Sequence, residues 1–456
     1  MIILVGLLLL LAPVILPAPD TMPETAWLAS GLALTMALFW LTEALPLPVT
    51  ALLPLAAAPL LGIAPIDVVA PAYSQPLVVL FLGGFMLAKA IETSGLHRRL
   101  AYSLLGISGN SPSSTLAAVM LATAFLSLWI SNTASAMVMA PIAASVAAGQ
   151  ENDRSFGTCL MLGVAFAATI GGMGSLIGTP PNAIFAAYVQ ETYGIEIGFA
   201  QWAAVGLPIA LVLLLITWFI LAHLTPGLRS AGAPPIIEDH LPALQTPERR
   251  VAIVVGATAL AWVSRPLIEA LFHVPLLTDP GIAITGALML FLFRDGKGRP
   301  LLTWDAAATL RWGVLILFGG GLALASILDR SGLATWIGGS LVAFQHLPSY
   351  LLVLLIAALI VYIGELASNT AMAAIFLPIA GASAIALDAD PIQFMLPVAF
   401  ASSIGFMLPV ATPPNAIVFG DSQVTRKDML RAGAPLDVVG IFIAVGLSAM
   451  LGPLFF

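Results

Sequence analysis

The tetrapeptide Ser-Asn-Thr-Ala occurs twice in this chain, at residues 131–134 and again at residues 368–371. Each copy lies inside an apolar stretch that is long enough to cross a membrane, and the two copies begin 237 positions apart. Ser and Asn cap the beginning of helices, so their presence in the middle of such a stretch indicates a break. We predict a helix that ends before each motif, unwinds for a few residues and begins again.

Two other motifs repeat at nearly the same distance. The segment 81–96 has a Gly-Gly pair near its start and ends with Ser-Gly-Leu, and it matches residues 318–333 at the same offset of 237. The sequence Thr-Pro-Pro-Asn-Ala-Ile at residues 179–184 matches residues 412–417 at an offset of 233. Three motifs in one order, twice, indicate an internal duplication. Duplicated helix-breaking sequence at membrane depth is typical of secondary transporters built from two half-repeats.

The composition predicts a membrane protein. Hydrophobic residues make up 60% of the 456 residues and charged residues 9%, whereas soluble domains carry about 25% charged residues. Because one crossing takes roughly 20 mostly apolar residues, the apolar runs predict an all-α polytopic protein with about ten or eleven spans. The first run, Ile2–Ile15, has no basic residue before it, and we interpret it as a membrane helix and not as a signal peptide.

Several function classes are excluded by what the chain lacks. A single cysteine, Cys159, excludes an internal disulfide and a thiolate metal cluster. The net charge of −7 provides no basic patch, so no nucleic-acid partner is expected. An enzyme is not expected either, because no nucleophile–base pair, metal-ligand cluster or phosphate loop stands in the apolar sequence.

The duplication divides the chain near residues 226–250, where prolines, glycine and charges interrupt the apolar pattern. This gives a first half of residues 1–235 and a second half of residues 236–456. The glycine-rich segment of each half is too short for two complete crossings. We therefore predict re-entrant hairpins at about residues 77–100 and 314–337, with the glycines as turning points. The alternative is one continuous helix that runs into its connector.

The broken helices at residues 131–133 and 368–370 predict paired binding sites. A restarted helix offers free N–H groups and a partial positive charge to an anion. The end of the preceding helix offers free carbonyl oxygens, which suit a small cation. Two such breaks that meet near the middle of the membrane would hold two anionic groups and at least two cations.

The loops at residues 178–182 and 411–415 each contain Thr-Pro-Pro-Asn. Proline removes an N–H donor and stops a helix from continuing, so free carbonyl oxygens gather in front of it. Gly178 and Ala411 are small enough to let these oxygens approach an ion. The asparagine that ends each motif is expected to cap or brace the turn.

Charge is missing around the first motif, since residues 116–149 contain no Lys, Arg, Asp, Glu or His. A dianion bound there needs compensation, because an uncompensated charge at membrane depth is costly. Mobile cations bound beside the anion are the obvious source, so the sequence predicts ion coupling. For Glu365 we favour a helix-packing hydrogen bond over a role as cation ligand or proton carrier, and for Glu43 a structural role at a helix end.

These motifs resemble a known family, the divalent anion/sodium symporters, which include sodium-coupled dicarboxylate, citrate and sulfate transporters. The resemblance rests on Trp-Leu-Thr-Glu-Ala-Leu-Pro-Leu-Pro-Val-Thr at residues 40–50, Phe-Leu-Gly-Gly-Phe at residues 81–85, Gly-Leu-His-Arg-Arg at residues 95–99, and both copies of the two paired motifs. It implies a homodimer in the inner membrane with about eleven spans and a cytoplasmic N-terminus. It also implies an inverted repeat with two opposed re-entrant hairpins, and a transport domain that slides like an elevator along a scaffold.

The resemblance further assigns roles to residues. It places a first sodium ion at Ser127, Ser131, Asn132 and the backbone of Gly178, and a second at Gly364, Ala367, Asn369 and Ala411. It assigns the two substrate carboxylates to Asn132 and Thr133 in one half and to Asn369 and Thr370 in the other, with Thr179, Thr412 and Pro413 bordering the substrate. One departure is that Gly364, the repeat partner of Ser127, stands where the family often has Thr.

The function that the sequence and the resemblance favour is sodium-coupled uptake of C4-dicarboxylates such as succinate, malate or fumarate, with two or more sodium ions co-transported. The alternatives are sodium-independent exchange of dicarboxylates and symport of sulfate or another divalent anion. A more distant alternative is an anion channel or an arsenite-type permease.

Overall fold

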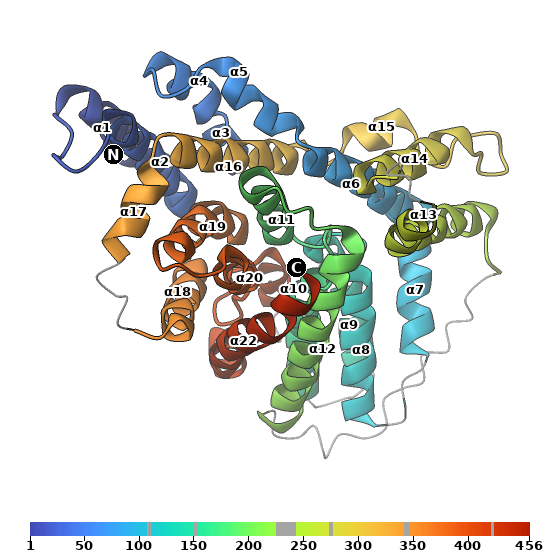
Figure 1. Cartoon of the computed structure of the whole chain (residues 1–456). Helices are drawn as coiled ribbons and strands as arrows, with labels where there is room; N and C mark the ends of the chain where they lie inside the picture. The colour runs from blue at the N-terminus through green and yellow to red at the C-terminus, as the bar shows by residue number, and fades with distance from the viewer. Residues whose placement is uncertain are drawn as a thin grey trace.

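A computed structural model describes residues 1–106, 109, 111–148, 154–224, 243–272, 277–341, 347–420 and 424–456. The expected division of the chain at residue 235 lies outside these residues. The described chain forms α-helices and one 3-10 helix, η1 (Figure 1), which in order are α1 (Ile2–Ile15), α2 (Glu24–Thr42), α3 (Leu47–Thr50), α4 (Leu53–Leu60), α5 (Ile66–Val69), η1 (Ala70–Ser74), α6 (Pro76–Ser94), α7 (Leu96–Leu105), α8 (Pro112–Ser127), α9 (Asn132–Ala148), α10 (Arg154–Met173), α11 (Pro180–Tyr193), α12 (Phe199–Leu224), α13 (Thr246–Phe272), α14 (Asp279–Leu292), α15 (Trp304–Ala308), α16 (Trp312–Arg330), α17 (Leu333–Leu341), α18 (Ser349–Gly364), α19 (Asn369–Ala386), α20 (Pro391–Ala401), α21 (Pro413–Phe419) and α22 (Arg426–Phe455).

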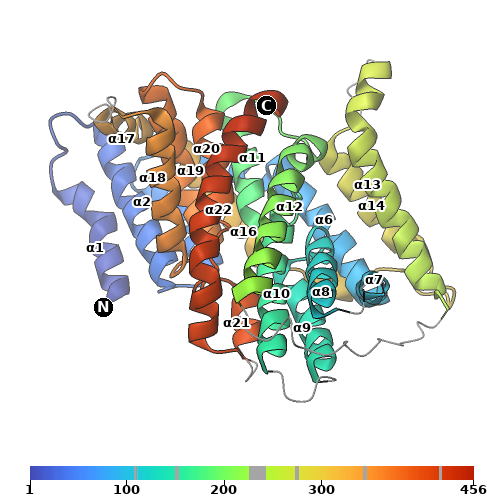
Figure 2. The ribbon, with the colours of Figure 1, turned by 90° about the horizontal axis from the view of Figure 1, so that it is seen from below.

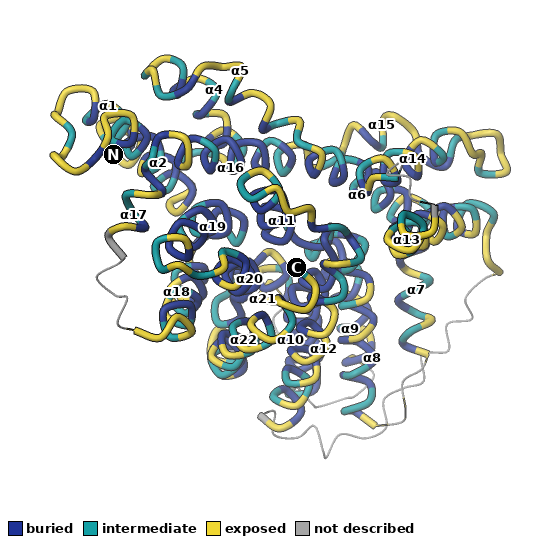
Figure 3. Tube along the Cα trace, in the orientation of Figure 1, coloured by how far each residue is buried: buried dark blue, intermediate teal, exposed yellow. Residues whose placement is uncertain are grey.

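The helices are those of a multi-pass membrane protein. Within the described residues, eight helices are long and apolar enough to cross a membrane, and several shorter apolar helices accompany them. The α10 span is buried throughout, whereas only 22% of the α13 span is buried. Large apolar side chains of α13 such as Leu260 and Leu267 are therefore exposed, where a bilayer would cover them. Figure 3 marks exposed residues along the trace of α13. The expected number of about eleven spans stays a prediction.

The internal duplication has a counterpart in the order of the helices. The seven helices from α6 to α12 match the seven from α16 to α22 in order, and the repeated motifs fall at equivalent helix ends. The equivalent helices α12 and α22 pack side by side (Figure 2). Phe185 contacts both Trp202, near the start of α12, and Phe456, at the end of α22, with ring centroids 5.7 and 6.3 Å apart. The two helices therefore run in opposite directions, which is the relation that an inverted repeat requires.

The glycines do not turn the chain, so that part of the hairpin prediction is wrong. Helix α6 runs through Gly83 without a break, and α16 runs through its three glycines in the same way. A Cβ atom on Gly83 would lie 2.6 Å from the Cβ of Ala283 in α14, so this glycine serves close packing of two helices. The chain turns later, at Gly95 and Gly332, whose φ angles of +83° and +80° suit glycine.

The hairpins lie at the Ser-Asn-Thr motifs instead. Helices α8 and α10 run in the same direction, because Gly163 of α10 lies against Leu116 and Gly171 lies against Ala124. Asn132, the first residue of α9, lies against Gly172, near the end of α10. If α9 continued in the direction of α8, its end would be on the order of 50 Å from the start of α10, and residues 149–153 cannot span that distance.

Helix α9 must therefore fold back between α8 and α10, and it does pack against α10. The first motif is the tip of a hairpin, which corrects the expectation of one broken helix at residues 131–133. The second half repeats the arrangement, because α18 and α19 both pack against α20. There the hairpin tip is the second Ser-Asn-Thr motif, at residues 368–370.

The two halves interlock around the hairpins. Helix α11 of the first half packs against α19 and α20, and α21 of the second half packs against α9 and α10. Figure 1 shows helices α8–α12 and α18–α22 gathered in one part of the molecule, with α6, α14 and α16 extending along one side of it. This crosswise packing brings both hairpin tips and both Thr-Pro-Pro-Asn turns to one place.

Candidate functional site

One cavity collects the repeated motifs. Its volume is about 510 Å³, and the starts of α9, α11, α19 and α21 all line it. Of the residues predicted from the sequence, eleven line this cavity: Ser131, Asn132, Thr133, Gly178, Thr179, Ala367, Asn369, Thr370, Ala411, Thr412 and Pro413. Ser127 and Gly364 do not line it, because both are buried behind the hairpin tips.

The helix starts give the cavity its electrostatic character. Each helix begins with N–H groups that have no partner within the helix, and its dipole places a partial positive charge there. The starts of α9, α11 and α19 belong to helices of 14 or more residues, and α21 adds a shorter one. A small anion is therefore stabilised in this cavity by backbone alone.

The first hairpin tip contains a cluster of oxygen atoms. The Asn132 side chain lies 2.7 Å from Ser127 Oγ, 3.2 Å from the Ala168 carbonyl oxygen and 3.3 Å from the Gly178 carbonyl oxygen. With the amide nitrogen on this side, Asn132 donates to all three groups. With the amide oxygen on this side, four oxygen atoms converge, which is the ligand set that a small hard cation takes.

The second hairpin tip has the same backbone but fewer partners. Asn369 begins α19 as Asn132 begins α9, and its Oδ1 atom is buried without a hydrogen-bond partner in the described structure. Gly364 stands where the first half has Ser127, so the second tip lacks the hydroxyl that lies beside the asparagine in the first tip. A buried oxygen without a partner fits a cation ligand, and Gly364 removes one of the groups that would assist it.

The Thr-Pro-Pro-Asn turns are braced in the same way in both halves. Asn182 Nδ2 donates to the carbonyl oxygens of Gly172 at 3.1 Å and Ser175 at 2.8 Å. Asn415 Nδ2 donates to the equivalent oxygens of Gly405 and Leu408, each at 3.0 Å. The bracing role expected for these asparagines is confirmed.

The N-terminal threonines of the same two turns differ from each other. Thr412 Oγ1 accepts a hydrogen bond from Asn415 N at 3.3 Å and caps α21. Thr179 begins α11 without a side-chain cap. The Thr179 hydroxyl, unlike that of Thr412, therefore does not cap the helix that follows it.

Two buried carboxylates distinguish the second half. Glu365 accepts hydrogen bonds from Met407 N at 2.9 Å and Leu408 N at 2.7 Å, and Asp437 accepts one from Phe406 N at 3.1 Å. Both side chains are at most 1% exposed. Three consecutive N–H groups of the turn after α20 are thus held by carboxylates, and the hydrogen-bonding role predicted for Glu365 is confirmed.

The first half has apolar residues at the equivalent positions. Leu128 is the repeat partner of Glu365 at the offset of 237. Gly206 of α12 lies against the Met173 carbonyl as Gly433 of α22 lies against the Phe406 carbonyl. Four residues after each glycine, the first half has an alanine and the second half has an aspartate. Sequence reasoning missed the aspartate because it lies 72 positions after Glu365, on α22.

Two charged residues line the cavity besides the repeated motifs. Arg311 precedes α16, and Glu43 follows α2 with a φ angle of +48°. Glu43 has the helix-end position that the sequence predicted, and it also faces the cavity. Desolvation lowers the pKa of the Arg311 guanidinium, an effect that Glu92 opposes, but an arginine stays charged at physiological pH. The absence of charge in residues 116–149 therefore does not extend to the whole cavity wall.

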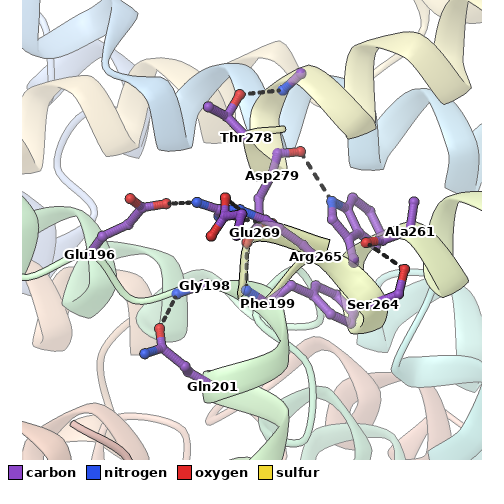
Figure 4. A network of polar contacts seen from close by, with 12 residues as sticks. Glu196, Gly198, Phe199, Gln201, Ala261, Ser264, Arg265, Glu269, Thr278 and Asp279 are labelled. Carbon is purple, nitrogen blue, oxygen red and sulfur yellow. Dashed lines mark hydrogen bonds and ion pairs between the residues drawn. The ribbon is translucent and has the colours of Figure 1, made fainter. Parts of the chain in front are cut away.

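A second polar cluster lies apart from this cavity and is shown in Figure 4. Arg265 of α13 forms ion pairs with Glu196 at 2.7 Å, Glu269 at 2.9 Å and Asp279 at 3.1 Å. Asp279 also accepts a hydrogen bond from Phe199 N at 2.6 Å. The cluster joins the segment before α12 to α13 and α14, and it has the arrangement of a structural tie.

The fold and the paired site define a class, the multi-pass membrane transporters with inverted repeats. Residues 1–456 match the family model described as the sodium:sulfate symporter transmembrane region. The chain is 34% identical over 473 residues to a sodium-dependent dicarboxylate transporter, SdcS, of Staphylococcus saprophyticus, covering 99% of this chain and 91% of that protein. It is 35% identical over 465 residues to SdcS of Staphylococcus aureus, covering 97% of this chain and 89% of that protein.

The chain belongs to the sodium:sulfate symporter family, which confirms the resemblance inferred from its motifs. Among solved structures it is similar in fold to the YdaH transporter of Alcanivorax borkumensis, with a TM-score of 0.62 at 16% identity. That comparison covers 92% of this chain and 98% of the other.

Proposed function

We propose that this protein couples the movement of sodium ions to the uptake of a C4-dicarboxylate such as succinate, malate or fumarate. The observation that carries the proposal is the pair of hairpin tips that face one cavity, each with a helix start beside buried oxygen atoms. A dicarboxylate has two anionic ends, and the cavity has two equivalent places for them. The names of the relatives from Staphylococcus support the same substrate class.

The roles follow from the chemistry of each tip. One carboxylate binds the N–H groups and side chains of Asn132 and Thr133, and the other binds those of Asn369 and Thr370. One sodium ion binds among Ser127, Ser131, Asn132 and the Gly178 carbonyl oxygen, and a second binds among Gly364, Ala367, Asn369 and Ala411. The sodium ions neutralise the dianion, which lowers the cost of moving it through the membrane.

We propose further that α8–α12 and α18–α22 move together as a transport domain along the remaining helices, in the manner of an elevator. In this proposal the protein is a homodimer in the inner membrane with a cytoplasmic N-terminus. The grouping of these helices around the cavity supports such a division (Figure 1). Mass measurement of the purified protein in detergent tests the dimer, because a monomeric mass would contradict it.

Sodium-independent exchange of dicarboxylates is the second candidate, and one feature favours it. Gly364 leaves the second tip without the hydroxyl that the first tip has at Ser127. If this weakens the second cation site enough, transport would proceed only when substrate is carried in both directions.

Uptake of labelled succinate into proteoliposomes tests the proposal and separates it from exchange. Three conditions are compared: an inward sodium gradient, potassium in place of sodium, and unlabelled succinate inside the vesicles. We expect uptake that needs sodium and needs no internal succinate. Uptake that ignores sodium but needs internal succinate would establish exchange. A substrate series with sulfate and citrate tests the choice of C4-dicarboxylates.

A further inference from the structure

Part of the cavity wall is formed by helices that contain neither the Ser-Asn-Thr nor the Thr-Pro-Pro-Asn motif. It includes Phe81 and Phe85 of α6, Leu47 of α3 and Val314 of α16, which are apolar. Arg311 and Glu43 are the charged residues among the described residues that line the cavity. They come from the start of α16 and from the end of α2, so each has a fixed place on this wall.

Neither charged side chain has a polar partner among the described residues. Within the described part of the chain, neither the Arg311 side chain nor the Glu43 side chain forms a hydrogen bond or an ion pair, and both residues are exposed. Glu92, the carboxylate that influences Arg311, forms its own ion pair with Lys89 at 3.3 Å. Glu43 is also held in the left-handed region of backbone space, which is uncommon for a residue other than glycine and is often found at functional positions.

We propose that Arg311 and Glu43 are specificity residues that attract the two cargoes separately, Arg311 the dicarboxylate and Glu43 the sodium ions. The inference rests on the proposed function, since it needs an anion and a cation that enter the same cavity. Fixed charges in a cavity with low-dielectric walls concentrate ions of opposite sign. The first hairpin tip has no formal charge in residues 127–133, and Glu365 of the second tip is held by the N–H groups of the turn after α20. The wall therefore provides the long-range attraction and the tips provide the close contacts.

Kinetics in proteoliposomes test the inference with two neutral variants. We expect Arg311→Gln to raise the KM for succinate at saturating sodium by about three- to tenfold, because one charge acts on a dianion across the cavity. We expect Glu43→Gln to raise the sodium concentration for half-maximal uptake at saturating succinate by about two- to fivefold. Each variant should change the kinetic constant for the other cargo by less than about twofold. Arg311→Lys should keep the wild-type KM for succinate, because long-range attraction depends on the charge, which lysine retains.

Matched controls come from the other ends of the same helices. Arg330 is exposed at the far end of α16, and Glu24 is exposed at the start of α2. Arg330→Gln and Glu24→Gln remove the same charges far from the cavity and should leave both constants unchanged. Unchanged constants in Arg311→Gln and Glu43→Gln, or equal changes in both constants for each variant, would overturn the inference.

Ionic strength provides a test that needs no variant. Raising choline chloride from about 0.05 M to about 0.3 M at fixed sodium shortens the screening length about twofold. The wild-type KM for succinate should then rise about two- to fourfold, and the KM of Arg311→Gln should stay nearly constant. A wild-type KM that does not respond overturns the inference. Failure of the proposed function is distinguishable, because wild-type protein would then show no sodium-dependent succinate uptake at all.

Discussion

The two hairpin tips have nearly the same backbone and different side chains around it. Both begin a helix with asparagine, both face the cavity, and both stand next to a turn braced by a second asparagine. The first tip adds a hydroxyl at Ser127, whereas the second has Gly364 in that place and leaves Asn369 Oδ1 without a partner. The duplication has therefore kept the geometry of the binding place and changed its chemistry.

The surroundings of the tips differ even more than the tips themselves. Behind the first tip the repeat positions are Leu128 and Ala210, and behind the second they are Glu365 and Asp437. The carboxyl groups of Glu365 and Asp437 accept hydrogen bonds from consecutive N–H groups of the second turn, and the first half has no acidic side chain at either position. We infer that the first tip is built around neutral oxygens and that the second is stabilised by two buried acidic side chains.

We expect the largest effect from removing the asparagine side chain that both tips share. Asn132→Ala and Asn369→Ala each delete a group that we assign both to an ion and to the substrate. Each variant should lower sodium-driven succinate uptake to the level of empty vesicles. Retention of full sodium-stimulated uptake in both variants would contradict the site assignment. Thermal unfolding in detergent is the control, because a folded and inactive variant separates binding from stability.

We expect the next largest effect from a substitution that makes the second half resemble the first. Glu365→Leu leaves the N–H groups of Met407 and Leu408 without acceptors in the interior, which we expect to cost about 2–5 kcal/mol of folding stability. Thermal unfolding of the purified protein measures the loss. Glu365→Gln is the control, since its amide oxygen still accepts one hydrogen bond and should recover part of the stability. Equal unfolding temperatures for wild type and Glu365→Leu would show that the carboxylate is not needed.

The comparison also shows which features the sequence predicts. The repeated motifs, the family and the helix starts at Asn132 and Asn369 follow from local residue types, because helix caps and prolines act within a few residues. The place of the hairpins does not follow from the glycines, because a glycine serves equally as a turning point and as a contact surface. Gly83 serves as a contact surface, and this role becomes visible only in its contact with Ala283, which lies 200 positions away in the sequence.

Some residues of the site cannot be predicted from the sequence for the same reason. Arg311 and Glu43 are separated by 268 positions in the sequence, and no local pattern indicates that both face one cavity. Asp437 is the last charged residue of α22, and its partner N–H group belongs to a turn that cannot be placed without the fold. Motif spacing predicts what a segment does within itself, whereas crosswise packing decides which segments meet.

A smaller effect tests the threonines of the two turns. Thr412→Val removes the hydroxyl that caps α21 and that we place beside the substrate, so it should cost about 1 kcal/mol of stability and change the preference between succinate and malate. Thr179→Val should change the substrate preference without the loss of a cap. Competition uptake with the two acids measures the preference. An unchanged preference in Thr412→Val would show that Thr412 does not border the substrate.

We expect the smallest effect from a substitution that adds the hydroxyl that the second tip lacks. A Cβ atom on Gly364 would have Met372 as its nearest neighbour, at 3.8 Å, so a serine fits without displacing other atoms. Gly364→Ser should bring its oxygen near Asn369 as Ser127 lies near Asn132, and one added ligand of about 1 kcal/mol lowers the half-saturating sodium concentration about fivefold. The sodium dependence of succinate uptake measures this change.

Ser127→Gly is the matched reverse change, because it gives the first tip the chemistry of the second. If hydroxyl ligands set cation affinity at both tips, Ser127→Gly raises the half-saturating sodium concentration and the double variant with Gly364→Ser returns it toward the wild-type value. If Gly364→Ser instead leaves the sodium dependence unchanged while Ser127→Gly alters it, the second tip binds its cation through backbone oxygens alone. The buried acidic side chains behind the second tip would then be the feature that compensates for the missing hydroxyl, since the first tip has none.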